Sequence, residues 1–335
     1  MPALPTDPLA PPLLDAQGRR MTYLRLSITD RCNFRCTYCS PASWGGKKDL
    51  LDAQELGRIA SLFAALGIRR VRLTGGEPLI RPDILEVARR IASIPGIQHL
   101  AITTNASHLA SLAAPLREAG VDQLNISLDT LSAQTFRSIS KQGDFDAVLA
   151  GIDRAAQVGY GSLKLNVVVM RGVNDHEARA LVEYAHARGL TPRFIELMPF
   201  GQGKPVPTAE LIERLRGEGL ALSPEPEETG AAADSITSGP ARYWRAPGGR
   251  VGFISPLTQN FCGGCNRVRV ASNGDLRSCL GGRAQAPLHQ LIRGGATDVE
   301  LARAIRAALG DKPEGHRFTE PGNGATLLSM MGIGG

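Results

Sequence analysis

Three cysteines within eight residues, Cys32, Cys36 and Cys39, constrain this chain more than any other feature of its sequence. The alternating segment 24–30 comes just before them and predicts a strand with one buried and one exposed face. The cysteines therefore lie on the loop that leaves the end of a strand. Thiols so close together cannot all pair with one another in disulfides, but they can converge on one iron–sulfur cluster, which usually takes four Cys thiolates. With three local ligands, one iron of a [4Fe–4S] cluster would stay open to another molecule.

Two other interpretations of this triplet stay open. Zinc binds Cys at similar spacings, although its structural sites normally take four protein ligands. Free cysteines can also be buried as small apolar side chains, but burial alone demands no such spacing. The spacing favours the iron–sulfur interpretation over both.

An aromatic residue, Tyr38, directly precedes the last cysteine, and the whole pattern resembles the signature of the radical S-adenosylmethionine (SAM) superfamily. The resemblance implies that the open iron chelates the methionine moiety of SAM and that cleavage gives a 5′-deoxyadenosyl radical, which abstracts a hydrogen atom from substrate. The segment 74–78, Thr-Gly-Gly-Glu-Pro, resembles the superfamily's G-G-E-P motif, which lies against the methionine amino group. The protein's task in such chemistry is to position the cofactor and to exclude side reactions.

Short apolar strand candidates alternate with amphipathic helices up to about residue 220. This alternation predicts an α/β fold, a partial (β/α)6 barrel with parallel strands, whose site lies at the carboxyl ends of the strands. The polar residue Asp129 follows one such strand and is expected to cap a helix. Strands are predicted at 22–29, 69–74, 98–103, 122–127, 163–169 and 192–197, and helices at 52–67, 82–94, 108–119, 132–140, 144–158, 176–188 and from 205 or 208.

The composition changes near residue 220, where Pro, Glu, Ala, Ser and Gly become frequent. We expect three parts: a flexible N-terminal arm at 1–20, the radical SAM partial barrel at 21–220, and a C-terminal auxiliary cluster domain at 221–335. The last part is expected to be a small α+β region that closes the barrel, with a β element around 243–254.

A second triplet, Cys262, Cys265 and Cys279, lies in this C-terminal part. The alternating segment 267–270 predicts a strand and 272–275 a tight turn, so a hairpin would return Cys279 to the other two cysteines. Three thiolates again suit a cluster with one open iron. Zinc is a stronger alternative here, because C-x2-C with a third Cys and a His is a zinc pattern and His289 follows ten residues after Cys279.

Charge and cysteine usage narrow the classes of function. The net charge is +6 and the pI about 9.2, which suits nucleic acid or a small polyanionic substrate, but aromatic residues are only 5%, few for stacking on bases. Cysteines in odd-numbered groups indicate metal and a reducing compartment. The sequence shows no signal peptide and no apolar run of roughly 20 residues, so we predict a cytoplasmic protein without a membrane span.

The segment 261–270, F-C-G-G-C-N-R-V-R-V, followed by a third cysteine, resembles the GTP 3′,8-cyclase family, which carries out the first step of molybdenum cofactor biosynthesis. The chain also ends in Gly334-Gly335, like that family, and the match runs from about residue 20 to 335. The resemblance implies two [4Fe–4S] clusters, the second of which binds guanine. It implies SAM contacts at Tyr38, Gly76, Ser127 and Met198, GTP contacts at Arg25, Arg72, Thr103, Lys164, Arg267 and Arg269, and a role for Arg267, Gly334 and Gly335 after hydrogen abstraction.

The implied reaction is a radical cyclisation. The deoxyadenosyl radical removes the ribose 3′ hydrogen, the carbon radical attacks C8 of guanine, and reduction gives 3′,8-cyclo-7,8-dihydro-GTP. The implied partners are an electron donor and a cyclic pyranopterin monophosphate synthase that uses the product; a homodimer is the family expectation. Arg and Lys are the side chains that bind a triphosphate strongly, which agrees with the basic contact set.

Two other functions stay open. The first is a different radical SAM enzyme with an auxiliary cluster, such as a peptide maturase, although these usually carry more auxiliary cysteines. The second is a zinc-stabilised nucleic-acid-binding protein, which the basic pI favours and the six β/α units oppose.

Overall fold

The computed structural model describes residues 7–39, 50–199, 202–226, 239–316 and 318. The strands are β1 (Tyr23–Ser27), β2 (Arg70–Thr74), β3 (His99–Thr104), β4 (Gln123–Ser127), β5 (Ser162–Val169), β6 (Thr191–Glu196), β7 (Ser223–Pro224), β8 (Arg242–Ala246), β9 (Gly249–Ile254), β10 (Arg267–Val270), β11 (Asp275–Arg277) and β12 (Ala286–Pro287). The α-helices are α1 (Ala53–Ala65), α2 (Ile84–Ala92), α3 (Leu109–Glu118), α4 (Ala133–Ser140), α5 (Phe145–Val158), α6 (Ala178–His186), α7 (Thr208–Gly217), α8 (Leu288–Arg293) and α9 (Asp298–Gly310).

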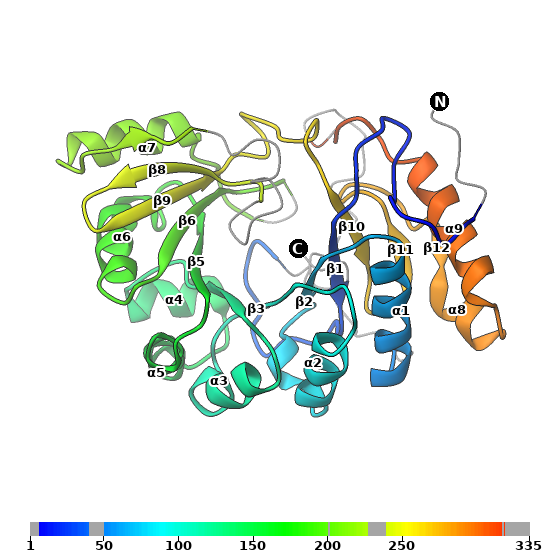
Figure 1. Cartoon of the computed structure of the whole chain (residues 1–335). Helices are drawn as coiled ribbons and strands as arrows, with labels where there is room; N and C mark the ends of the chain where they lie inside the picture. Colours follow the sequence, from blue (N-terminus) through cyan, green and yellow to red (C-terminus); the bar gives the residue numbers. More distant parts are fainter. Residues whose placement is uncertain (1–6, 40–49, 200–201, 227–238, 317, 319–335) are drawn as a thin grey trace.

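The strands form one curved sheet with the order β12-β11-β10-β1-β2-β3-β4-β5-β6-β9-β8-β7. The run from β10 to β9 is parallel throughout, and the outer strands are antiparallel. The six predicted β/α units and the partial barrel are therefore confirmed. The C-terminal region extends the barrel at both edges, because β10 pairs with β1 and β9 pairs with β6 (Figure 1). Among the described residues, the first and last strands of the sheet, β12 and β7, do not hydrogen-bond to each other. Strand pairing therefore leaves the barrel open.

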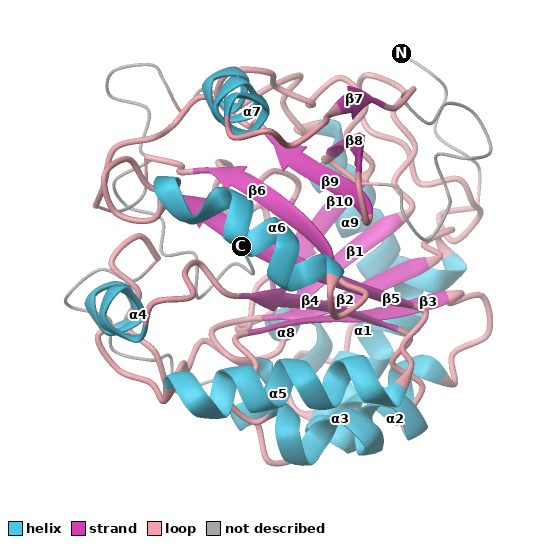
Figure 2. Ribbon diagram, turned by 90° about the vertical axis from the view of Figure 1, so that its left-hand side faces the viewer, coloured by secondary structure: helices cyan, strands magenta, loops and turns pink. Residues whose placement is uncertain are grey.

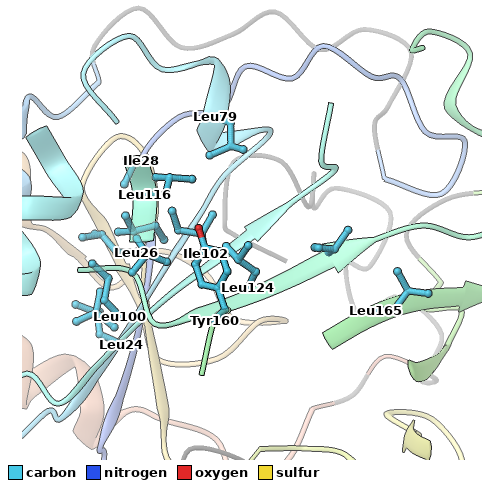
Figure 3. Packing of buried hydrophobic residues seen from close by; sticks show 14 of the residues in the cluster. Leu24, Leu26, Ile28, Leu79, Leu100, Ile102, Leu116, Leu124, Tyr160 and Leu165 are labelled. Atoms are coloured by element: carbon cyan, nitrogen blue, oxygen red, sulfur yellow. The ribbon is translucent and has the colours of Figure 1, made fainter. Parts of the chain in front are cut away.

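The core lies between the outer face of the sheet and the helices. Leu24 and Leu26 of β1 are fully buried on this face, as are Ile102 and Leu124 of the neighbouring strands (Figure 3). Helices α2, α3 and α5 cover the face side by side (Figure 2). Burying one such side chain contributes about 1.5–3 kcal/mol, so this layer fixes which face of each strand points outward. The alternate residues of each strand then face the barrel interior.

Helix α1 begins where the sequence predicts. The Asp52 carboxylate accepts a hydrogen bond from the main-chain N of Glu55 at 2.8 Å, and the Glu55 carboxylate accepts one from the main-chain N of Asp52 at 2.9 Å. This is a capping box. Gly67, with φ of 102°, follows the last turn in a conformation that favours glycine.

The Asp52 cap supports a prediction about stability. Asp52→Ala should lower the free energy of unfolding by about 1 kcal/mol, because a main-chain N–H in the first turn loses its acceptor. Thermal unfolding of the purified chain measures the effect as a lower midpoint. Glu118→Ala, an exposed position at the end of α3, is the control and should change the midpoint little. Equal midpoints for the two variants would contradict the cap's contribution.

The N-terminal residues 7–20, where we expected a flexible arm, pack against the rest of the molecule. Leu13 is fully buried, and Leu14 forms an antiparallel bridge with Arg20. The Arg306 guanidinium of α9 donates to the main-chain oxygen of Pro8 at 2.8 Å, so this segment runs beside α9 (Figure 1). None of the described helices combines the length and apolar composition that a membrane crossing needs.

Candidate active site

The first cysteine triplet follows the carboxyl end of β1, as predicted. Its loop is tied to the end of α4 by main-chain hydrogen bonds from Arg35 to Ser140 at 2.8 Å and from Thr37 to Ile139 at 3.0 Å. All three cysteines are partly buried and none is in a disulfide. The fixed loop therefore presents three free thiols at the carboxyl edge of the barrel.

The paired glycines after β2 press closely against this loop. A Cβ on Gly75 would lie 2.1 Å from the Thr29 main-chain oxygen, and a Cβ on Gly76 would lie 2.1 Å from the Arg31 main-chain oxygen and 3.0 Å from Cys32 Cβ. The main-chain N of Gly76 donates to the Thr29 oxygen at 2.9 Å. Only glycine permits so close an approach of two backbones. The G-G-E-P segment thus fixes the position of Cys32.

We therefore expect Gly76→Ala to displace the cysteine loop. The new methyl group has to move main chain rather than a flexible side chain, so the variant should lose most of the iron bound at the first triplet and unfold at a lower temperature. Iron analysis after anaerobic reconstitution and thermal unfolding measure both effects. Gly172→Ala is a control for adding a methyl group, because a Cβ there meets nothing within 4 Å, although its φ of 71° adds some local strain. A Gly76→Ala chain with full iron would contradict the close approach.

Glu77 of the same segment is buried and anchors the next strand end. Its carboxylate accepts hydrogen bonds from Thr104 Oγ1 at 2.7 Å and from the main-chain N of Asn105 at 2.7 Å and of Leu79 at 3.0 Å. Burial raises the pKa of Glu77 to about 7, against the opposing effect of these bonds. The loops after β2 and β3 are thereby joined beside the first triplet.

Asp129 is not the helix cap that we expected. Tyr38 Oη donates to Asp129 Oδ2 at 2.7 Å, and the main-chain N of Val168 donates to Oδ1 at 2.8 Å. The cap of α4 is Ser132, whose hydroxyl accepts from the main-chain N of Thr135. The sequence suggested a helix cap because Asp129 follows a strand and precedes a helix. Nothing near it in the sequence indicates the contact with Tyr38, which lies 91 residues earlier. Burial raises the pKa of Asp129 to about 6.

The predicted SAM contacts meet only in part. Tyr38 and Ser127 line one small cavity together with Cys36 and Asp129. Met198 follows β6 at the same edge of the barrel, but neither Met198 nor Gly76 lines this cavity. Gly76 instead lies against the loop that carries Cys32. The four residues therefore share the carboxyl edge of the sheet without forming a single cavity wall.

The second triplet lies at the opposite end of the barrel. β10 runs parallel to β1 with Arg267 opposite Tyr23, so Cys265 lies near the amino end of β1, whereas Cys32 follows its carboxyl end. At about 3.3 Å per residue, the five residues of β1 put roughly 16 Å of strand between the two ends. The interior of the barrel lies between the triplets.

The predicted hairpin is confirmed, and it separates the second triplet from His289. β10 pairs with β11 antiparallel, Arg269 opposite Arg277, which returns Cys279 towards Cys265. His289 packs on Gly274, in the turn at the other end of this hairpin. The zinc pattern that included His289 is therefore not formed.

The thiols of both triplets suit iron–sulfur clusters. Burial, together with the neighbouring Cys32 and Asp129, raises the pKa of Cys39 to about 12. Burial and Cys39 likewise raise the pKa of Cys36. Thiolates in such surroundings need a bound cation. Burial also raises the pKa of Cys265, but Arg267 and Lys312 outweigh it and bring the value to about 6. In the described residues, no three His, Cys, Asp or Glu side chains converge closely enough to share a single metal ion.

The interior between the triplets is strongly basic. Arg25 lies opposite Arg269 on one neighbouring strand and Arg72 on the other, and Lys164 projects from the far side of the barrel. Burial and the neighbouring Arg269 and Arg72 hold the pKa of Arg25 well below its usual value. Burial and Arg193, Arg72 and Arg70 lower the pKa of Lys164 to about 6. Such a concentration of positive charge suits a polyanionic ligand.

The structure adds Arg193 and Tyr23 to this interior, and the sequence reasoning missed both. Arg193 Nη2 donates to Asn125 Oδ1 and to Asn166 Oδ1, each at 2.6 Å. The Tyr23 ring contacts the Arg72 guanidinium 5.3 Å from its centroid. Both residues could have been found from the sequence, because alternate positions of the strands at 191–196 and 23–27 face the interior.

Several inward polar atoms are ready for a ligand. Tyr23 Oη, Arg72 Nε and Thr103 Oγ1 are buried and have no hydrogen-bond partner within the described part of the chain. Buried polar atoms normally have such a partner. A cleft of about 940 Å³ has Thr22, which directly precedes Tyr23, in its wall, together with Trp244, Arg250 and Arg267. Gly334 and Gly335 lie outside the described residues.

Both the open parallel barrel and its cysteine loop are those of a radical SAM enzyme. The pattern of the Radical SAM superfamily matches residues 26–185, and that of Molybdenum Cofactor Synthesis C matches residues 190–318. The structure of Streptococcus suis SuiB bound to precursor peptide SuiA superimposes with a TM-score of 0.60, covering 94% of this chain and 77% of that one, at 15% identity, which shows the shared fold.

Two relatives match almost end to end. GTP 3′,8-cyclase 1 of Pseudomonas aeruginosa is 45% identical, over 96% of this chain and 99% of that protein. GTP 3′,8-cyclase of Pseudomonas savastanoi pv. phaseolicola is 42% identical, over 97% and 99%. The chain belongs to the GTP 3′,8-cyclase family of the radical SAM superfamily.

Proposed function

We propose that this chain converts GTP into (8S)-3′,8-cyclo-7,8-dihydro-GTP, the first step of molybdenum cofactor biosynthesis. Family membership supports the reaction, and one observation of the structure carries it. This observation is the basic interior between two cysteine triplets at opposite ends of one barrel. It offers a triphosphate site within reach of both triplets.

The chain's cofactor ligands are divided between the two ends. Cys32, Cys36 and Cys39 would hold one [4Fe–4S] cluster, and the second triplet, Cys262, Cys265 and Cys279, would hold another. With SAM bound, the clusters supply a hydrogen-abstracting radical at one end and an anchor for the guanine base at the other. Tyr38, Gly76, Ser127 and Met198 would position SAM from the carboxyl edge of the sheet.

The interior residues bind and orient the nucleotide. Arg25, Arg72, Lys164 and Arg269 would bind the triphosphate through charge-assisted hydrogen bonds. Thr103 would supply a hydroxyl from the next strand, and Arg267, at the start of β10, lies closest to the second triplet. With the base held at one end and the phosphates along the wall, the ribose is kept in place for reaction. Such orientation can supply about 7–11 kcal/mol of the barrier.

GTP deuterated at ribose C3′ tests the proposal. Anaerobically reconstituted enzyme with SAM and a strong reductant should form 5′-deoxyadenosine that is one deuterium heavier. Unlabelled 5′-deoxyadenosine, formed equally well without GTP, would keep the radical chemistry and reject GTP as the substrate. A chain that binds zinc instead of iron would reject both.

The finer assignments are proposals as well. We infer that an electron donor reduces the enzyme, that a cyclic pyranopterin monophosphate synthase uses its product, and that the chain works in the cytoplasm, with a homodimer as the family expectation. The division of the chain at residue 220 stays a prediction, because β9 and β10 enter the same sheet as β1 to β6. Similarity to SuiB concerns the fold alone and does not favour a peptide substrate.

A further inference from the structure

Two cations from opposite ends of the chain, the buried Lys312 and the partly buried Arg19, hold the backbone of the second triplet. Lys312, 3% exposed, follows α9, and its Nζ donates to the main-chain oxygen of Arg267 at 3.0 Å and to that of Ser278. Arg267 comes two residues after Cys265, and Ser278 directly precedes Cys279. Lys312 therefore joins the two strands that carry these cysteines.

Arg19 holds the third cysteine. Its Nη1 donates to the main-chain oxygen of Cys262 at 2.7 Å and to that of Glu314 at 2.8 Å, and its Nη2 donates to that of Pro313 at 2.7 Å. The buried Asp15 fixes the guanidinium through Nε at 2.6 Å. Arg19 thus ties Cys262 to the segment that directly follows Lys312. At each cysteine of the triplet, one of these two cations binds a main-chain oxygen. For Cys262 it is the oxygen of the cysteine itself, and for Cys265 and Cys279 it is that of a residue one or two positions away.

The two triplets differ in their charged neighbours. Two carboxylates, Asp129 and Glu77, raise the pKa of the thiols in the first triplet, although burial raises it more and Arg35 opposes the shift at Cys32. Lys312 and Arg267 are the charged neighbours of Cys265. Cations packed together in a protein repel one another, so their position here is favourable only beside negative charge. Thiolates and the cluster that they bind would supply that charge.

We propose that Arg19 and Lys312 form a cationic clamp that positions the second cluster and raises its reduction potential; the proposal rests on the second cluster of the proposed function. Net charge and hydrogen bonding around the cysteines are among the factors that set the potential of an iron–sulfur cluster. A nearby ammonium stabilises the reduced form, which carries one more negative charge. Arg19 and Lys312 are positioning residues, since neither is placed to touch the substrate.

Lys312→Met removes the charge and both hydrogen bonds while keeping much of the side-chain length. In the otherwise unaltered chain, reconstituted without oxygen, it should lose about half of the bound iron, because the second triplet no longer converges. Formation of 5′-deoxyadenosine from SAM without GTP depends on the first triplet and should stay within about twofold of the unaltered chain, which shows that the barrel is folded. Lys312→Arg should restore the iron.

The potential is measured in a chain whose first triplet is Cys32→Ser, Cys36→Ser and Cys39→Ser, so that only the second cluster contributes to the electron paramagnetic resonance signal. In this background Lys312→Met should give a lower midpoint potential for whatever cluster it retains, and Lys312→Arg should not. Arg306→Met is the matched control. Arg306 is also buried and binds main-chain oxygens of Pro8 and Pro12, but none next to a cysteine.

Full iron and an unchanged midpoint potential in Lys312→Met, equal to those of Arg306→Met, would overturn the clamp. Should Lys312→Met fail to fold, Arg19→Lys decides, because it keeps the charge and loses the forked contacts. It should release iron from the second triplet to a chelator faster than Arg306→Lys does, and equal rates would overturn the proposal. All these measurements omit GTP, so failure of deuterium transfer from GTP would reject the proposed function separately.

Discussion

Cys36→Ala should abolish 5′-deoxyadenosine formation, whereas Cys262→Ala should retain it and lose only the transfer of deuterium from GTP. Cys36 lies in the loop beside the G-G-E-P segment, and Cys262 lies beyond the amino end of β1, at the other end of the barrel. We expect a loss of at least about 100-fold for Cys36→Ala, because residues that merely support metal ligands already cost 10–100-fold. Mass spectrometry of the deoxyadenosine measures both activities in one assay.

This pair of variants separates the two ends of the barrel. Each serves as the other's control for folding, since each should keep the iron of the intact triplet. Loss of SAM cleavage in Cys262→Ala, with the first cluster still present, would contradict the division of roles. Deuterium transfer in Cys36→Ala would contradict the assignment of the first triplet to SAM.

GTP binding should weaken as the pH rises above 6, and Lys164→Met should remove most of this dependence. Burial and the cations Arg193, Arg72 and Arg70 lower the pKa of Lys164 to about 6 in the free protein. Lys164 is therefore mostly neutral at pH 7.5. A bound triphosphate favours the ammonium and raises the pKa again, so binding takes up a proton. The affinity for GTP is therefore highest below pH 6, where Lys164 is already charged in the free protein. It falls as the pH rises and levels off above the pKa of Lys164 in the GTP complex.

Isothermal titration calorimetry in two buffers of different ionisation enthalpy measures the proton uptake at pH 7.5. Lys164→Met should bind GTP about 10- to 100-fold more weakly at pH 6, as expected for the loss of a hydrogen bond to a charged group. The exposed Lys204→Met is the control, and it should keep the proton uptake that Lys164 contributes. Identical proton uptake in Lys164→Met, Lys204→Met and the unaltered chain would contradict the role of Lys164.

The barrel could be predicted from the sequence because each of its strands and helices is marked by residues close together in the chain. The alternating leucines of β1 and the Asp52 cap of α1 can each be recognised from residues a few positions apart. Both elements lie where they were predicted. Helices α8 and α9 were not predicted, although Thr297 and Glu300 form a capping box whose T-x-x-E pattern is visible in the sequence. Only the pairing of β9 and β10 with opposite edges of the barrel had no local signal.

The candidate site divides in the same way. The cysteines could be assigned from spacing, since their ligand chemistry needs few residues close together. Asp129 could not, because its partner Tyr38 comes from a distant loop. Arg193 was missed because an inward arginine on a strand looks like a surface charge until the sheet is known to curve around an interior. Lys312 was missed because its acceptors are main-chain oxygens, which no side-chain pattern reveals.

The pairing of β1 with β10 has a consequence for the order in which the protein is made. β1 leaves the ribosome early, but the strand that completes its outer edge follows about 240 residues later, roughly 10–50 s at 5–20 residues per second. During that time the strand that delivers the first three cysteines has an unpaired edge, which is a template for aggregation. A chain that ends before residue 267 would keep every ligand of the first triplet and still expose this edge. We expect such a chain to aggregate rather than to accumulate as a half-enzyme.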